Sequence, residues 1–154
     1  MSQRLFATWV AAVAASLVLG AAHPARADVT TECEFFEISA KAGPKAAIDG
    51  ELKPVERKLK KAPFLTWNQF KLLSHSKRPL DKKKPEAISL KVGTATATLI
   101  EIVDKSKVRL TVTMEDDKGK QVVNNTTTVE AGDYVMFVHE LAGNEGHLLS
   151  LTCK

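Results

Sequence analysis

The clearest pattern in the chain is a strict alternation of apolar and polar residues over residues 108–115. Every second residue from Val108 to Met114 is apolar, and the residues between them are charged or carry a hydroxyl group. A period of two is typical of a strand with one buried and one solvent-facing side. The acidic, glycine-containing residues 116–119 then predict a hairpin turn into a partner strand at residues 121–129.

Similar β-type runs fill the C-terminal half of the chain, separated by turn residues. Including the hairpin, they lie at residues 88–92, 94–103, 108–115, 121–129, 134–139 and 147–153. Two earlier runs, at residues 33–40 and 64–75, bring the number of predicted strands to eight, the second with a bend near Asn68. This succession predicts a mainly β fold, an antiparallel β-sandwich or an open barrel.

One helical pattern follows the first strand. Apolar residues recur at spacings of four, three and four from Ile48 to Leu59, which places them on one face of a helix. Pro54 is tolerated only in the first turn, so we expect a regular helix over residues 53–61, with its basic side chains toward solvent. Residues 76–87, rich in Lys and Pro, predict a polar connection.

The N-terminal residues have the composition of an export signal. Residues 1–27 contain no acidic side chain. The nearly unbroken apolar run at residues 5–22 is followed by the small-residue triplet 25–27. This predicts a secretory signal peptide, cleaved before Asp28, that leaves a single β-rich domain at residues 28–154 in a bacterial periplasm or outside the cell. An uncleaved anchor helix is the alternative, because about 18 apolar residues approach a membrane span. After cleavage we expect no membrane span.

The two cysteines lie near the two ends of the predicted mature chain. Cys33 is in the first predicted strand, and Cys153 is the second-to-last residue. In an oxidising compartment the two thiols would join, so we expect a disulfide that makes the first and last strands neighbours in space. A catalytic role is disfavoured because the chain contains no C-x-x-C spacing.

Charge is unevenly distributed along the mature chain. Residues 53–91 hold twelve basic and three acidic residues, a local net charge of +9, while the segments on either side are acidic. Such a basic segment favours a partner that is an anionic lipid, an acidic glycan or an envelope protein. We do not expect nucleic acid as a partner outside the cytoplasm. Solubility alone would explain the same lysines. The candidate anion-binding residues are Lys58, Lys60, Lys61, Lys77, Arg78, Lys82, Lys83 and Lys84.

A second candidate site surrounds the last predicted turn. His139 and His147 would come close across a terminal hairpin, with Glu145 inside the turn. Two imidazoles and a carboxylate can hold Zn²⁺ or Cu²⁺, although the spacing matches no established ligand repeat, and surface residues at a turn are the simpler interpretation. We otherwise expect no cofactor.

No catalytic motif is present, because the chain lacks a G-x-S-x-G elbow, a P-loop, a dinucleotide fingerprint and a zinc-protease helix.

The chain resembles small exported bacterial proteins of unknown function in two places. These are the stretch L-K-K-x-P-F-x-x-W-N-x-F-K-L-L at residues 59–73 and the ending L-x-L-T-C-K at residues 149–154. The resemblance transfers no active site. We therefore expect a non-catalytic envelope protein that binds or scaffolds; the alternatives are a periplasmic metal-handling protein and a hydrolase with an unrecognised site.

Overall fold

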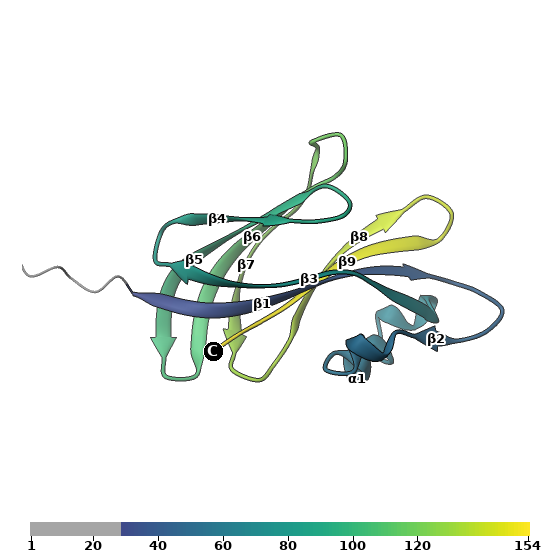
Figure 1. The fold of residues 1–154 in the computed structure, drawn as a ribbon, viewed down its shortest axis with the longest axis horizontal. Helices are drawn as coiled ribbons and strands as arrows, with labels where there is room; N and C mark the ends of the chain where they lie inside the picture. Colours follow the sequence, from purple (N-terminus) through teal and green to yellow (C-terminus); the bar gives the residue numbers. More distant parts are fainter. Residues whose placement is uncertain (1–28) are drawn as a thin grey trace, which may run out of the picture.

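A computed structural model describes residues 29–154, which form two β-sheets packed face to face (Figure 1). One sheet has the strand order β2-β3-β1-β9-β8, and the other has the order β4-β5-β6-β7. The strands are β1 (Thr30–Lys41), β2 (Ala47–Ile48), β3 (Gln69–Asp81), β4 (Pro85–Ser89), β5 (Thr94–Asp104), β6 (Lys107–Glu115), β7 (Gln121–Glu130), β8 (Val135–Leu141) and β9 (Glu145–Cys153). The predicted mainly β sandwich is confirmed, and neither sheet of the described part closes into a barrel. The predicted signal peptide lies outside the described residues.

Strand β1 is apolar on both faces because it lies between two separate cores. Cys33 and Phe35 point between the two sheets, into a core to which β5, β6 and β9 contribute most of the other side chains. Phe36 and Ile38 point to the opposite face of the five-stranded sheet, into a second core. A strand buried on both faces carries apolar residues at consecutive positions, so its sequence does not alternate.

The second core is covered by residues 50–66, which we call the cover segment. It consists of the 3₁₀ turns η1 (Gly50–Leu52) and η2 (Phe64–Thr66) and the single helical turn α1 (Glu56–Leu59). The predicted apolar face is confirmed, since Leu52, Val55 and Leu59 are buried. The predicted extent, residues 53–61, is wrong: the regular helix spans only four residues, and turns on either side bring the apolar side chains to the sheet.

Strand β3 differs most from the sequence prediction. The predicted strand at residues 64–75 begins in a 3₁₀ turn, and the true strand starts at Gln69 and continues to Asp81, through the first half of the expected polar connection. It pairs with β1 along its whole length, and Leu80 is fully buried in the sandwich core. Because β2 pairs with it only at its first two residues, the rest of β3 is a sheet edge, where lysines and Pro79 are tolerated.

The remaining strands confirm the predicted meander and the predicted disulfide. Strands β5, β6 and β7 pair in sequence, and the Asp116 side chain accepts hydrogen bonds from the backbone N–H groups of Lys118 and Lys120 in the turn between β6 and β7. Strand β9 lies directly beside β1, with Cys33 opposite Cys153, and the two cysteines form a disulfide. No helix in the described part of the chain is long and apolar enough to cross a membrane.

Candidate functional site

An open groove of about 440 Å³ lies beside the cover segment. One wall is the short strand β2, and the other is formed by α1 and η2. Its apolar lining consists of Ile48, Leu59, Leu65, Trp67 and Phe70. A volume in this range and a mainly apolar lining are typical of small-molecule sites. We refer to this depression as the groove.

Trp67 is held at the base of the groove by the turn between β8 and β9 and by the start of β9. Its indole Nε1 donates a hydrogen bond to the backbone oxygen of Asn144, at 3.0 Å. The six-membered ring lies over Gly146, where an added Cβ would sit 2.7 Å from ring carbons. Glycine is therefore required at position 146 for the indole to lie this close to the strand. The tryptophan is 7 % exposed, so it forms the floor of the groove rather than a projecting side chain.

Two amide side chains hold the wall that contains β2. The Asn68 side chain donates to the Gly43 carbonyl oxygen and accepts from the Gly43 N–H, at 2.8 and 2.9 Å. Gln69 donates to the backbone oxygen of Lys45 at 2.8 Å. These bonds tie the loop between β1 and β2 to the start of β3, so the wall is held by specific contacts as well as by packing.

Charged side chains line one rim of the groove. Lys60 forms an ion pair with Glu56, one helical turn away on α1. The hydrogen bond from Lys60 and its charge hold the pKa of the Glu56 carboxyl below its ordinary value. Leu65, at the tip of η2, is 68 % exposed, an unusual position for a large apolar side chain next to charged ones. The groove thus joins an apolar floor to a charged rim.

The candidate basic residues do not form one surface. Lys58, Lys60 and Lys61 belong to the cover segment, whereas Lys82, Lys83 and Lys84 follow the far end of β3. Strand β3, thirteen residues long, leads from the end of the cover segment to the second group. Figure 1 places α1 and the connection between β3 and β4 toward opposite ends of the molecule. Lys77 and Arg78 lie between them, on opposite faces of β3.

One of these lysines has a structural role. The Lys58 Nζ atom forms an ion pair with Asp133 at 2.6 Å and donates a hydrogen bond to the backbone oxygen of Tyr134. The hydrogen bond from Lys58 also holds the pKa of Asp133 below its ordinary value. Lys58 therefore ties the cover segment to the connection between β7 and β8. Its charge is already matched within the chain.

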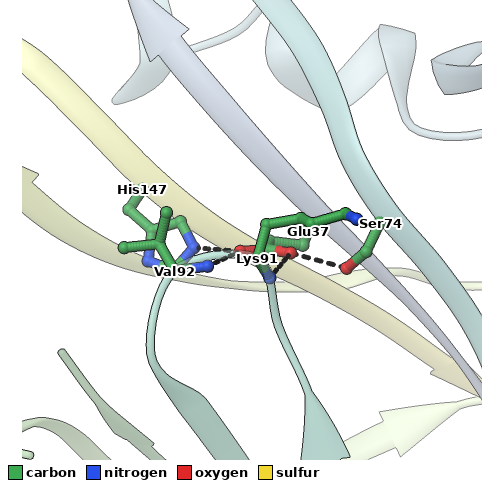
Figure 2. A network of polar contacts seen from close by, with 5 residues as sticks. All are labelled: Glu37, Ser74, Lys91, Val92 and His147. Carbon is green, nitrogen blue, oxygen red and sulfur yellow. Dashed lines mark hydrogen bonds and ion pairs between the residues drawn. The ribbon is translucent and has the colours of Figure 1, made fainter. Parts of the chain in front are cut away.

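A buried polar network joins the two sheets near the middle of the sandwich (Figure 2). The Glu37 carboxylate on β1 accepts hydrogen bonds from the backbone N–H groups of Lys91 and Val92, at 2.7 and 2.9 Å. It also accepts from Ser74 on β3 at 2.5 Å and from His147 on β9 at 2.9 Å. Because Lys91 and Val92 belong to the connection between β4 and β5, the carboxylate fastens one sheet to the other.

The charge of Glu37 is stabilised in place. Burial raises the pKa of Glu37, but the four hydrogen bonds together lower it more, so the carboxyl titrates below its ordinary range. Although a serine, a glutamate and a histidine meet here, the order is wrong for nucleophilic catalysis. The Ser74 hydroxyl donates to Glu37 and not to His147, so the serine–histidine contact of a catalytic triad is not formed by these residues.

The candidate metal ligands are only partly brought together. His139 lies directly opposite His147 in the pairing of β8 with β9, as the sequence predicts. However, His147 is 3 % exposed and bound to Glu37, and the described residues contain no group of three or more His, Cys, Asp or Glu side chains able to hold a metal ion. Glu145 therefore does not complete a site with the two histidines. The third histidine of the described residues, His75, pairs with Glu34 at 2.6 Å and stacks on Phe36.

Sequence reasoning missed both Glu37 and the groove. Glu37 lies two residues after Phe35 and four after Cys33, so the alternation of a strand places all three side chains on the same face of β1. This alternation would have predicted that the carboxylate points between the two sheets. The groove carries no such signal, because its walls come from separate segments. No protein-family model, curated protein or solved structure matches this chain. Its functional interpretation therefore rests on the geometry of its own residues.

Proposed function

We propose that this chain is an exported, non-catalytic binding protein of the bacterial cell envelope, and that the groove holds the apolar part of a single-chain anionic amphiphile. The observation that carries the proposal is an apolar groove of about 440 Å³ with a basic segment at its rim. The β-sandwich is then the rigid scaffold, and the cover segment is the binding element. This placement is common, because connecting segments on a rigid scaffold carry much of protein function.

The apolar character of the ligand follows from the floor of the groove. Trp67 and Phe70 are buried beneath it, and Leu59 and Ile48 line its sides. Leu65 is exposed beside it, and contact with a hydrocarbon chain would remove this side chain from water. Burial of apolar surface is favourable in proportion to the area removed from water, so a flexible hydrocarbon chain suits a groove of this shape.

The anionic character of the ligand follows from charge. The cover segment carries five basic residues and two acidic residues, and Lys60 itself lines the groove. Lys60 is paired with Glu56 at the rim of the groove. An incoming carboxylate or phosphate group would share that ammonium group, and the local net positive charge favours its approach. Since the lysines after β3 lie at the other end of the molecule, they take no part in this site.

Binding can be measured with Trp67 as the reporter. The exported protein carrying Trp9→Phe has Trp67 as its only tryptophan, whether or not the N-terminal residues are removed. We expect titration with laurate, below its micelle-forming concentration, to change the fluorescence of Trp67 and to reach saturation. Dodecanol, which has the same chain without the charge, should bind more weakly, and acetate should have no effect. Failure of laurate to give a saturable change would overturn the proposal.

Matched variants separate the groove from the rest of the surface. Ala47→Phe adds a ring to the wall of the groove and should abolish laurate binding, while Ala87→Phe adds the same ring to an exposed position on β4 and should leave it unchanged. Lys60→Gln should weaken laurate binding and Glu56→Gln should strengthen it, with little effect on dodecanol. Equal effects of the two phenylalanine variants would contradict a site in the groove.

The expected location has its own test. Cell fractionation should place the protein in the periplasm or the medium, and N-terminal sequencing of that material should begin at Asp28. Recovery of the intact N-terminus from the cytosol would contradict export.

A further inference from the structure

Strand β7 is an outer strand of its sheet and is unusually poorly protected. In the described structure it pairs only with β6, so its other side presents unpaired backbone groups along ten residues. Residues 121–129 contain no charged residue and no proline. Natural proteins usually protect such an edge with lysines, prolines, bulges or a short strand, because an open edge recruits another strand. Here the one irregularity is a bulge near the first residues of β7.

The other three outer strands are protected. Strand β2 has two residues and lies beside the cover segment. Strand β4 has five residues and contains Pro85 and Glu86, and β8 has seven residues and contains His139 and Glu140. The open edge of β3, residues 71–81, is longer, but it carries Lys71, Lys77, Arg78 and Pro79. Among the strands that the structure describes, β7 is thus the long edge with the least protection. This contrast points to a specific use of the edge.

The residues at the two ends of β7 have opposite charges. Lys120 immediately precedes the strand, and Glu130 is its last residue; both are exposed, and neither has an ion-pair partner among residues 29–154. If two copies of β7 run antiparallel side by side, Lys120 of each copy lies at the Glu130 end of the other. The bulge near the start of β7 displaces Lys120 by about one residue from the position directly opposite Glu130 of the other copy. The long Lys and Glu side chains can span this displacement. A two-fold symmetric pair would therefore gain two opposite-charge contacts.

The side chains along β7 also suit pairing with themselves. Asn124, Thr126 and Thr128 share the solvent-facing side of the sheet, and the hydroxyl of Thr126 hydrogen-bonds that of Thr111 on β6 at 2.8 Å. In an antiparallel pair of β7 strands, Asn and Thr side chains would meet Asn and Thr side chains across the junction. Hydroxyl and amide groups opposite one another can continue the same kind of hydrogen bond.

We propose that two copies of this chain associate through β7, antiparallel, so that the two four-stranded sheets join into one sheet of eight strands. The two-fold axis passes beside Asn125, so that Asn124 of each copy lies opposite Thr126 of the other. A junction made by one strand from each copy buries little surface, so the dimer is weak and depends on protein concentration. This association is independent of the groove, which lies on the other sheet.

Charge reversal tests the proposed direction of pairing. Sedimentation equilibrium of the exported protein should show a mass that rises toward twice the monomer mass as concentration increases. Lys120→Glu or Glu130→Lys places like charges side by side at both ends and should raise the dissociation constant about tenfold. The double variant K120E/E130K restores opposite charges between copies and should return the constant close to its original value.

A control and a stability measurement accompany this series. Lys118→Glu makes the same charge change in the neighbouring turn, outside the paired strand, and should leave dimerisation unchanged. Urea unfolding of each variant checks that the fold persists, because Glu130 also lies opposite Lys107 within one copy. A protein that stays monomeric at every concentration, or a double variant no better than the singles, would overturn the proposal.

Cysteine cross-linking tests the position of the axis. A residue on a two-fold axis faces its own copy, so Asn125→Cys should form a covalent dimer under mild oxidation, seen on a non-reducing gel. Thr128→Cys has the same exposure on the same strand but would lie well away from its own copy. It should remain monomeric on the gel. Cross-linking at position 128 as efficient as at position 125 would contradict an ordered antiparallel pair.

Discussion

The two faces of β1 contact cores of very different construction. Between the sheets, Phe35, Leu149 and the two cysteines are at most 3 % exposed, and long paired strands surround them. On the other face, the cover segment closes the core with short turns, and Leu65 stays 68 % exposed beside the groove. One strand thus contributes to a closed core and to one that is partly open.

This difference separates stability from access to ligands. Long strands satisfy their backbone hydrogen bonds along the whole sheet, so they can enclose a core without gaps. Short turns bury only a few side chains each and leave a surface between them. Regions with few buried contacts open at lower free energy than the core does. We therefore expect the sandwich to carry most of the stability and the cover segment to adapt to a ligand.

The largest expected effect comes from removing the disulfide in the sandwich core. Replacement of both cysteines, Cys33→Ala with Cys153→Ala, should lower the free energy of unfolding by up to about 5 kcal/mol, because the bond closes a loop of more than a hundred residues in the unfolded chain. Urea unfolding measures the loss. A loss below about 1 kcal/mol would show that the paired strands hold the termini without the covalent bond.

A matched pair of phenylalanines compares the two cores directly. Phe35→Ala should cost about 4 kcal/mol, because the surrounding strands cannot collapse into the cavity. Phe64→Ala, in the cover segment, should cost less, about 3 kcal/mol, because the neighbouring turns can move into the space. Hydrogen exchange should show faster exchange confined to the cover segment in the second variant. The reverse order of costs would contradict the division between a rigid and an adaptable core.

The buried Glu37 network should contribute less than either core. Glu37→Gln replaces an acceptor with an amide whose NH₂ group faces hydrogen-bond donors, so we expect a loss of about 2 kcal/mol in urea unfolding. Ser74→Ala removes one of the four bonds and serves as the milder comparison. If the two variants were equally stable, the carboxylate would not be the centre of the network.

The same residue makes stability depend on pH. Since the pKa of Glu37 is lower in the folded state than in the unfolded chain, its contribution is fully present above about pH 4.3, the ordinary value for glutamate. The contribution is lost as the pH falls through the lowered pKa. Unfolding measured from pH 6 down to pH 2 should therefore show a smaller pH dependence in Glu37→Gln than in the original protein.

The smallest predicted change concerns the floor of the groove. Gly146→Ala places a methyl group 2.7 Å from the Trp67 ring, which must shift outward. We expect a cost of about 1 kcal/mol, because a ring at the margin of a core moves more easily than one at its centre. A changed fluorescence maximum of Trp67 should accompany it. Gly50→Ala is the matched control, because a Cβ at this position meets no atom within 4 Å. Gly132→Ala, in the turn between β7 and β8, is unsuitable as a control because Gly132 has a positive φ.

The sequence predicted best where one side of a strand faces water. Along β6, single buried residues alternate with exposed or partly exposed ones, and its position, its turn and its partner β7 were all predicted. Prediction failed where an edge strand resembles a loop, as in the Lys- and Pro-rich end of β3. It also failed where turns bury the same residues as a helix would, as in the cover segment.

The candidate sites show the same limits. The chain has two cysteines, so each has a single possible partner within the chain, and the disulfide was predictable. His139 and His147 were correctly placed opposite each other, but the sequence could not show that Glu37, 110 residues before His147, already binds that imidazole. The lysines of the predicted basic segment proved to belong partly to the cover segment and partly to the connection after β3, with the long strand β3 between them.

The sequence by itself determined the fold class, the hairpins and the covalent link between the first and last strands, because alternation, turn residues and a single cysteine pair are local or unique signals. Only the tertiary structure decided which segments meet. The groove, the Glu37 network and the open edge of β7 each depend on contacts between residues far apart along the chain. Such contacts are set by how the two sheets and the cover segment pack together, and local sequence patterns do not encode that packing.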